Sequence, residues 1–276
     1  MPAYIRILTP TGLQPAAYTA DSLADAAQFE SHDGVYTLTN TFNTFQTLKL
    51  DAHLDRLEDS ARREHIPLEL DRKLLRSVLR QMIADSGFGD VRFRITVSRV
   101  APQDLTTSLE PFKPLSPEVI AQGVRCITAA GSARLHPEAK TTDWMHDRKL
   151  IEAALPEGIY TALLLSETGD ILEGLSSNFY AILEGELRSA GEGILPGIAQ
   201  QIVYAIAPQV LPVRKEAVNV RDLPHLREAF ITSSSRGIVP VVEIDGIRIG
   251  QGVPGGQTQL LRAAYDAWVQ AHLEDL

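Results

Sequence analysis

The sequence is short of cysteine, since Cys126 is the only one among 276 residues. A single cysteine cannot form an intrachain disulfide. No uninterrupted apolar run approaches the roughly 20 residues that a membrane-spanning helix needs. The first residues, MPAYIRILTPTG, also lack the basic and apolar regions of a signal peptide. These absences predict a soluble, cytoplasmic protein.

The sequence also lacks a block of basic residues. Its net charge is −9, and the charges are spread along the chain. Nucleic acids and anionic lipids attract clustered lysine and arginine, so both are poor candidates for partners. Composition therefore disfavours polyanionic macromolecules as partners.

Several common catalytic motifs are missing. The chain has no Gly-x-Gly-x-x-Gly, Walker, His-Glu-x-x-His, Cys-x-x-Cys or Gly-x-Ser-x-Gly pattern. Nucleotide-loop, zinc-protease and serine-hydrolase functions thus lose their usual support. We expect no metal site.

The first part of the chain predicts a hairpin followed by two helices and a strand. Residues 35–50 are rich in threonine, aromatics and leucine, with a polar turn near Asn43. We expect Asp51 to cap the next helix. The apolar positions of that helix recur at helical spacing: Leu54, Leu57 and Ala61. A second helix is predicted over 72–85, ended by Gly87, and an alternating strand starts at Val91.

Three prolines between residues 109 and 118 predict a domain linker. We therefore expect a small α/β domain over 1–112 and a larger, cofactor-binding domain over 119–276.

The second part of the chain predicts mainly hairpins. Their turns are expected at Thr168 and Gly169, and at Glu184 and Gly185. Helical patterns follow over 198–207 and 257–276. Since hairpin strands pair antiparallel, the predicted fold class is α+β rather than alternating βαβ.

Five separated motifs remain. Together they would supply donors for one anion and one reactive amine. They are HLDRL with Arg56, EAKTTDW with Lys140, ILEGLSSNFY with Glu173, GILPGIA ending at Ala199, and EAFITSSSRGIVPV at 228–241. In this order and at these spacings they resemble the class IV aminotransferases, which are pyridoxal-phosphate enzymes of fold type IV. The resemblance runs from about Val35 to Val241, and Lys140 precedes Glu173 by 33 residues (173 − 140), a spacing that the family uses.

The resemblance implies a binding site for the phosphate of pyridoxal 5'-phosphate. It assigns this role to the side chain of Arg56, the main-chain amides of Ile198 and Ala199, and the hydroxyls of Ser233 and Ser234. Physically this is sound, because a helix N-terminus offers unpaired N–H groups and arginine offers a planar fork for phosphate oxygens.

The resemblance also assigns the chemistry. Lys140 would form an internal aldimine with the cofactor aldehyde, and its freed amine would then carry a proton between the substrate and the cofactor. Glu173 would pair with the pyridine nitrogen and keep it protonated, so that the ring accepts electrons. A homodimer is further implied.

Some positions depart from the family pattern. Trp144 stands where many relatives have a tyrosine after the lysine, so Tyr36 is the candidate substitute. Ala199 replaces a common threonine, which removes one hydroxyl from the phosphate site. Ser235 and Arg236 occupy positions where relatives receive the substrate carboxylate, and they are assigned with Tyr36 to the substrate.

The arginine and histidine arrangement expected for D-amino-acid carboxylates is not found in the first domain. Three arginines nevertheless lie on the appropriate strand: Arg92, Arg94 and Arg99.

Three functions are compatible with these residues. The first is amino transfer between an amino acid, or a related primary amine, and a 2-oxo acid. The second is a lyase similar to aminodeoxychorismate lyase, which releases pyruvate with the same lysine and cofactor. The third is a catalytically silent relative that binds the cofactor or a partner, which intact Lys140 and Glu173 disfavour. The sequence does not determine the donor, the acceptor or the stereochemistry.

Replacing Lys140 with alanine should abolish turnover and remove the absorption band of the internal aldimine, because no other amine is expected to bond to the cofactor. Lys149→Ala is the matched control, since Lys149 follows in the same segment but fits no family position. Absorption spectra and turnover of both variants test the assignment, and equal effects of the two substitutions would refute it.

Overall fold

The computed structural model describes residues 2–276. The chain divides into two compact units. The first unit contains residues up to 113 together with 139–147 and 272–276, and the second contains 114–138 and 148–271. Two short segments that we expected in the second domain, 139–147 and 272–276, thus group with the first unit. The domains proposed at 1–112 and 119–276 remain a prediction.

The first unit is built on a seven-stranded sheet with the strand order β16-β4-β3-β5-β6-β1-β2. The strands are β1 Tyr4–Thr9, β2 Gly12–Pro15, β3 Gly34–Phe42, β4 Gln46–Leu48, β5 Val91–Ser98, β6 Ala101–Pro111 and β16 Leu273–Asp275. All neighbouring strands pair antiparallel. The hairpin predicted over 35–50 is β3 and β4, and its turn contains Asn43 at φ 50°.

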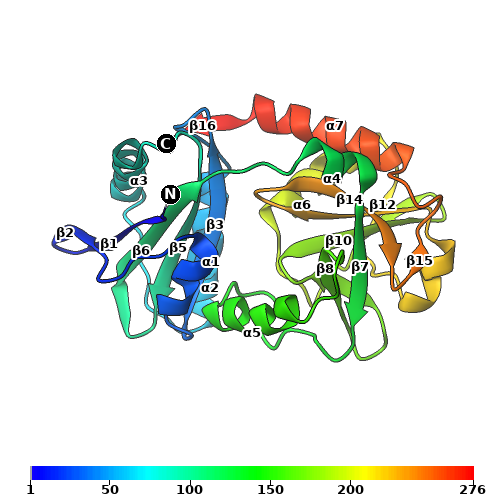
Figure 1. Cartoon of the computed structure of the whole chain (residues 1–276), viewed down its shortest axis with the longest axis horizontal. Coiled ribbons are helices and arrows are strands. Elements are labelled where there is room, and N and C mark those ends of the chain that lie inside the picture. The colour runs from blue at the N-terminus through cyan, green and yellow to red at the C-terminus, as the bar shows by residue number, and fades with distance from the viewer. Residues whose placement is uncertain (1) are drawn as a thin grey trace. The chain divides into compact units, whose positions relative to one another are not determined.

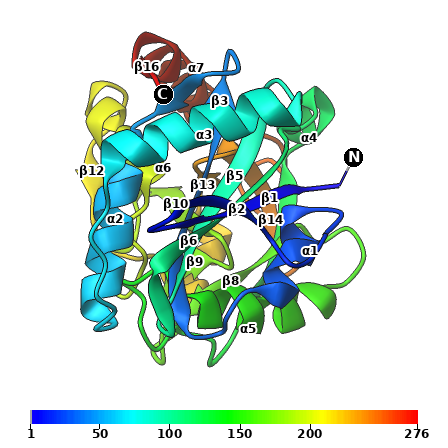
Figure 2. The same cartoon turned by 90° about the vertical axis from the view of Figure 1, so that its left-hand side faces the viewer.

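Two helices, α2 (Leu50–Arg63) and α3 (Arg72–Ser86), lie across this sheet (Figure 2). The predicted inward positions of α2, Leu54, Leu57 and Ala61, are all buried and pack with β5 in the core of the unit. Burial of this apolar stripe is what stabilises the helix.

One detail of α2 was predicted wrongly. Asp51 does not cap it: the N-cap residue is Lys49, in the left-handed region at φ 50°, and Asp51 lies in the first turn. There its carboxylate forms an ion pair with Arg76, 3.1 Å away. Its negative charge also interacts favourably with the positive N-terminal end of the helix dipole. The second helix ends at Gly87, as expected, with φ 65°.

A buried ion pair joins β5 to the short helical segment before β3, formed by α1 (Leu23–Ala26) and the 3-10 turn η1 (Ala27–Phe29). Arg94 donates to both oxygens of Glu30 and, at 2.8 Å, to the carbonyl of Leu23. Thr96 donates a further hydrogen bond to Glu30. Both charged side chains are almost fully buried, so each depends on the other for compensation.

The second unit contains a closed ring of six strands. They are β7 Val124–Ala129, β8 Thr161–Leu165, β9 Ile171–Gly174, β10 Ser177–Leu183, β13 Glu228–Ser233 and β14 Gly237–Ile244. The order β10-β13-β14-β7-β8-β9 closes because β9 also pairs with β10. At the closure Gly174 faces both Leu163 and Ser177, and a Cβ on Gly174 would lie 2.4 Å from the Ser177 hydroxyl.

Short strands and helices complete the second unit (Figure 1). The remaining strands are β11 Glu186–Arg188, β12 Val213–Arg214 and β15 Ile247–Arg248, with the 3-10 turns η2 Ala207–Gln209 and η3 Val220–His225. The helices are α4 Pro117–Gln122, α6 Ile198–Ile206 and α7 Gly256–Ala271. A further helix, α5 Thr142–Ala153, has its first residues in the first unit.

The predicted hairpins are confirmed as β8–β9 and β10–β11, and the α+β class is confirmed. Two predicted boundaries are wrong. The last helix stops at Ala271, since Leu273–Asp275 pairs with β4 as β16. The proline-rich stretch 109–118 is not all linker, because residues 109–111 end β6 and 117–118 begin α4.

No helix among the described residues has both the length and the apolar character to cross a membrane. Cys126 is a free thiol buried on β7, and burial raises its pKa to about 12. It is therefore a core residue rather than a reactive one.

Replacing Glu30 with glutamine should destabilise the protein by about 3 kcal/mol, because Arg94 would stay buried without its counter-charge. Urea unfolding followed by circular dichroism measures this. Asp59→Asn is the control, since Asp59 pairs with Arg62 and Arg63 at the surface and should cost less than ~1 kcal/mol. Similar losses in both variants would contradict the role of the buried pair.

Candidate active site

The backbone of Lys140 is fixed on both sides. Its carbonyl accepts a hydrogen bond from the Tyr36 N–H of β3 at 3.0 Å, and its own N–H donates to the Ser60 hydroxyl of α2 at 3.0 Å. The next residue, Thr141, forms an isolated bridge with Val35. These contacts direct the lysine amine, whose Nζ lies 4.5 Å from the centre of the Tyr36 ring. The structure thus brings together two of the predicted site residues.

One face of α2 supports this lysine. His53, Arg56 and Ser60 follow one another at spacings of three and four residues, which places them along one side of the helix. Arg56 is half-buried there. His53 is 1% exposed, and its Nδ1 lies 3.1 Å from the Thr37 hydroxyl of β3. His53 and Ser60 were not predicted as site residues, although their spacing from Arg56 is visible in HLDRLEDS.

The environment of His53 keeps its ring neutral. Burial lowers its pKa well below the ordinary 6.5, and the positive charges of Arg56, Lys140 and Lys49 lower the pKa further. A neutral His53 ring thus adds no third positive charge to those of Arg56 and Lys140, which act on it.

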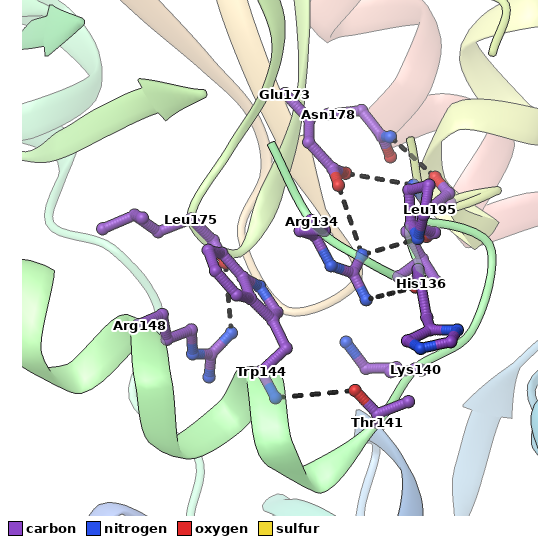
Figure 3. A network of polar contacts seen from close by, with 12 residues as sticks. Arg134, His136, Lys140, Thr141, Trp144, Arg148, Glu173, Leu175, Asn178 and Leu195 are labelled. Atoms are coloured by element: carbon purple, nitrogen blue, oxygen red, sulfur yellow. Dashed lines mark hydrogen bonds and ion pairs between the residues drawn. The ribbon is translucent and has the colours of Figure 1, made fainter. Parts of the chain in front are cut away.

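Glu173 lies on β9 in the second unit and is 4% exposed. Figure 3 shows its carboxylate between Arg134 and the backbone of Leu195. Arg134 Nη1 donates to Glu173 Oε1 at 3.2 Å, and the Leu195 N–H donates to Oε2 at 3.2 Å. Arg134 also donates to the carbonyls of His136 and Pro137. The carboxylate is thus bound by an arginine and a backbone amide.

Arg134 was not predicted, and no signal in the sequence pointed to it. It lies in the segment GSARLHPEAK, six residues before Lys140 (140 − 134). Its pairing with Glu173 joins residues 39 apart in the chain. Only the fold reveals this contact.

The motifs around Glu173 and Pro196 are physically linked. Asn178 of β10 donates its side-chain amide to the Leu195 carbonyl at 2.9 Å, while the Leu195 N–H binds Glu173. A Cβ at Gly197 would lie 1.9 Å from Asn178 Oδ1, so a larger residue there would displace the Asn178 side chain. The pair LEGxSSN and ILPGI therefore describes one packed arrangement.

The helix α6 begins directly after Gly197. Ile198 and Ala199 are its first two residues, both are buried, and no side chain caps their N–H groups. The first N–H groups of a helix have no acceptor within it. This end of α6 therefore offers two backbone donors.

The serine-rich segment forms the end of β13 and its turn into β14. Ser233 is the last residue of β13, and Ser234, Ser235 and Arg236 form the turn. The Arg236 N–H donates to the Ser233 carbonyl at 3.2 Å, so this amide is used inside the turn. The Ser235 hydroxyl is buried and has no hydrogen-bond partner among residues 2–276.

The Arg236 side chain turns back onto the chain instead of pointing to solvent. Its guanidinium contacts the hydroxyls of Ser233, Ser176 and Tyr160. All three of its nitrogens donate within the second unit.

The three arginines of the β5 region are engaged in the first unit. Each pairs with an acid: Arg92 with Glu110, Arg94 with Glu30, and Arg99 with Asp33. Arg92 and Arg94 form these ion pairs on β5, whereas Arg99, expected on the same strand, lies just beyond its end at Ser98.

Within each unit, the structure groups the predicted residues. The first unit holds Tyr36, Arg56 and Lys140. The second holds the remaining ones: Glu173, Ile198, Ala199, Ser233, Ser234, Ser235 and Arg236. Trp144 lies on α5, where its N–H donates to the Thr141 hydroxyl at 3.5 Å. No cluster of three or more potential metal ligands occurs within the described part of the chain.

The lowered pKa of His53 predicts a pH-dependent stability. Below about 6.5 the unfolded chain binds a proton that folded His53 does not, so stability should fall as the pH drops, by up to ~1.4 kcal/mol per pH unit. His53→Gln should remove this component from urea unfolding curves between about pH 7.5 and 5.5. The exposed His225 supplies the control, His225→Gln, and an unchanged slope in His53→Gln would contradict the neutral buried ring.

Comparisons with known proteins agree with this arrangement. The chain is 28% identical over 251 residues to a putative branched-chain-amino-acid aminotransferase of Methanocaldococcus jannaschii, covering 84% of this chain and 86% of that protein. It is 28% identical over 249 residues to the D-alanine aminotransferase of Bacillus licheniformis, covering 86% and 87%.

Among solved structures, the fold matches a branched-chain amino acid aminotransferase of T.th., crystallised with pyridoxamine 5'-phosphate. The TM-score is 0.80 at 20% identity, over 98% of both chains. The branched-chain aminotransferase of Thermoproteus uzoniensis with norvaline matches equally, with a TM-score of 0.80 at 20% identity over 100% and 99%. The family model for amino-transferase class IV matches residues 34–244, and the chain belongs to this family.

Proposed function

We propose that this protein is a pyridoxal-phosphate-dependent aminotransferase that moves an amino group between an amino acid, or a related primary amine, and a 2-oxo acid. One observation carries the proposal: the backbone of Lys140 is fixed by β3 and Ser60, and its amine lies 4.5 Å from the centre of the Tyr36 ring. A lysine held in this way serves as both nucleophile and proton carrier.

The donor set fits pyridoxal 5'-phosphate. Its phosphate needs hydrogen-bond donors, which the α6 N-terminus and the serine turn offer in the second unit. The family resemblance adds the positive charge of Arg56. The buried Ser235 hydroxyl has no partner among residues 2–276. A buried hydroxyl normally has a hydrogen-bond partner, so a bound ligand that accepts its hydrogen bond fits this turn. Lys140 would bind the aldehyde, and Glu173 would face the ring nitrogen.

When bound, pyridoxal phosphate supplies an electron-withdrawing ring and carries the amino group between the two half-reactions. The chain supplies the rest. Lys140 Nζ would take the proton from the substrate α-carbon and return it after transfer. Glu173, whose carboxylate is oriented by Arg134 and Leu195, would keep a proton on the ring nitrogen.

The substrate contacts are assigned to Tyr36 and to the turn that contains Ser235 and Arg236. The arginines of the β5 region already pair with acids, which disfavours them as ligands for a D-amino-acid carboxylate. The chain is equally similar, at 28% identity, to a branched-chain and to a D-alanine aminotransferase, so an experiment must identify its amino donor.

We further propose a cytoplasmic homodimer. The family resemblance supports the dimer, and the free, buried Cys126 agrees with a reducing compartment. Light scattering at several protein concentrations tests the dimer.

Adding an amino donor without a 2-oxo acid tests the function directly. An aminotransferase should convert its cofactor stoichiometrically to the pyridoxamine form, seen as a spectral change, because the first half-reaction needs only the donor. A panel of L- and D-amino acids and primary amines should include at least one such donor. Release of pyruvate without conversion would instead indicate a lyase, and neither change would indicate a silent relative.

Glu173→Gln is the informative variant in this assay. It should retain the cofactor, because the phosphate contacts remain, but slow the conversion, because glutamine holds the ring proton less well. Arg56→Ala should show the opposite pattern, with weaker cofactor retention. Conversion by Glu173→Gln at the normal rate would assign the electron-sink role to another residue.

A further inference from the structure

Arg236 connects three separate parts of the second unit. Its Nε donates to the Ser233 hydroxyl at 2.8 Å, and its Nη1 donates to the Tyr160 hydroxyl at 3.2 Å. Its Nη2 donates to the Ser176 hydroxyl at 3.0 Å and to the Ser176 carbonyl at 3.1 Å. Ser176 lies in the turn between β9 and β10, so Arg236 ties this turn to the end of β13.

These contacts fix the role of each hydroxyl. A guanidinium has only donors, so Ser233 and Ser176 must accept from it. Their own O–H protons then need other acceptors, and residues 2–276 provide none for either hydroxyl. The Ser235 hydroxyl between Ser233 and Arg236 is buried and likewise without a partner there.

The result is a group of hydroxyls suited to a ligand that only accepts hydrogen bonds. The positive charge of Arg236 polarises the Ser176 and Ser233 hydroxyls, which strengthens their donation to an anion. A phosphate monoester or a carboxylate has this chemistry, because an ionised oxyanion offers lone pairs and no donors.

We propose that Arg236 is a positioning residue that orients the hydroxyls of Ser176 and Ser233 as donors to a bound oxyanion, either the cofactor phosphate or the substrate carboxylate. The choice between these two ligands rests on the proposed function. Four of the five N–H donors of Arg236 already bond within the chain, so at most one is left for the ligand and the two hydroxyls are the main donors. This role replaces the direct substrate contact predicted from the sequence and adds Ser176 to the site.

Binding to the apoprotein tests the proposal without turnover. Pyridoxal 5'-phosphate and pyridoxal, which lacks the phosphate, are titrated by tryptophan fluorescence into the wild type, Arg236→Ala, Arg236→Lys, Ser176→Ala/Ser233→Ala and the corresponding triple variant. Michaelis constants for an amino donor, pyruvate and 2-oxoglutarate are measured in parallel. Arg214→Ala is the matched control, since Arg214 pairs with Glu186 and Glu216 at the surface.

If the oxyanion is the phosphate, Arg236→Ala should weaken binding of pyridoxal 5'-phosphate about tenfold, ~1.4 kcal/mol, and leave pyridoxal unchanged. In the variant that lacks both hydroxyls, the same substitution should have less than about half of this free-energy effect, because residues in one hydrogen-bond network are not additive. Arg236→Lys should recover part of the loss.

If the oxyanion is the substrate carboxylate, the same coupling should appear in the Michaelis constants, to similar degrees for pyruvate and 2-oxoglutarate. Two results would overturn the proposal. One is a loss in Arg236→Ala that is just as large without the two hydroxyls, which would make Arg236 a direct ligand. The other is no loss beyond that of Arg214→Ala. Coupling in the cofactor titration without any amino transfer would support the positioning role and refute the proposed function instead.

Discussion

The candidate site depends on how the backbone of Lys140 is held. A lysine side chain is long and flexible, so its amine is useful only if the main chain fixes where it starts. Here β3 binds the carbonyl through Tyr36, and α2 binds the N–H through Ser60. Both elements are anchored by the apolar core of the first unit, so the packing of that core also determines where the lysine amine lies.

The same helix also sets the electrostatic surroundings of the lysine, because His53 lies on the face of α2 that carries Ser60 and burial keeps its ring neutral. In the second unit the buried charge is negative: it is the carboxylate of Glu173, and Arg134 pairs with it.

Local patterns predicted the parts of the fold that local forces determine. The hairpins β8–β9 and β10–β11 follow from alternating apolar residues and turn residues, and the buried face of α2 follows from apolar spacing. The strand β16 was missed, because its pairing with β4 joins residues that are far apart in the chain, such as Leu273 and Leu48. A helix-forming pattern gave way there to a long-range contact.

The candidate site shows the same division. The motifs predicted the residues to which the family resemblance assigns a role. They did not predict the side chains that contact and orient those residues. Arg134 contacts Glu173 across 39 residues, and Arg236 contacts Ser176 across 60. Spacing along the chain gives no sign of such pairs, because the fold of the second unit, with its closed ring of strands, brings them together.

The central claim is that Lys140 is the amine that binds the cofactor. Borohydride reduction of the cofactor-loaded protein makes permanent any bond between a lysine amine and the cofactor aldehyde, and peptide mass spectrometry then locates the added mass. We expect one modified site, in the peptide that contains Lys140. Modification at Lys149 or another lysine, with Lys140 unmodified, would contradict this claim.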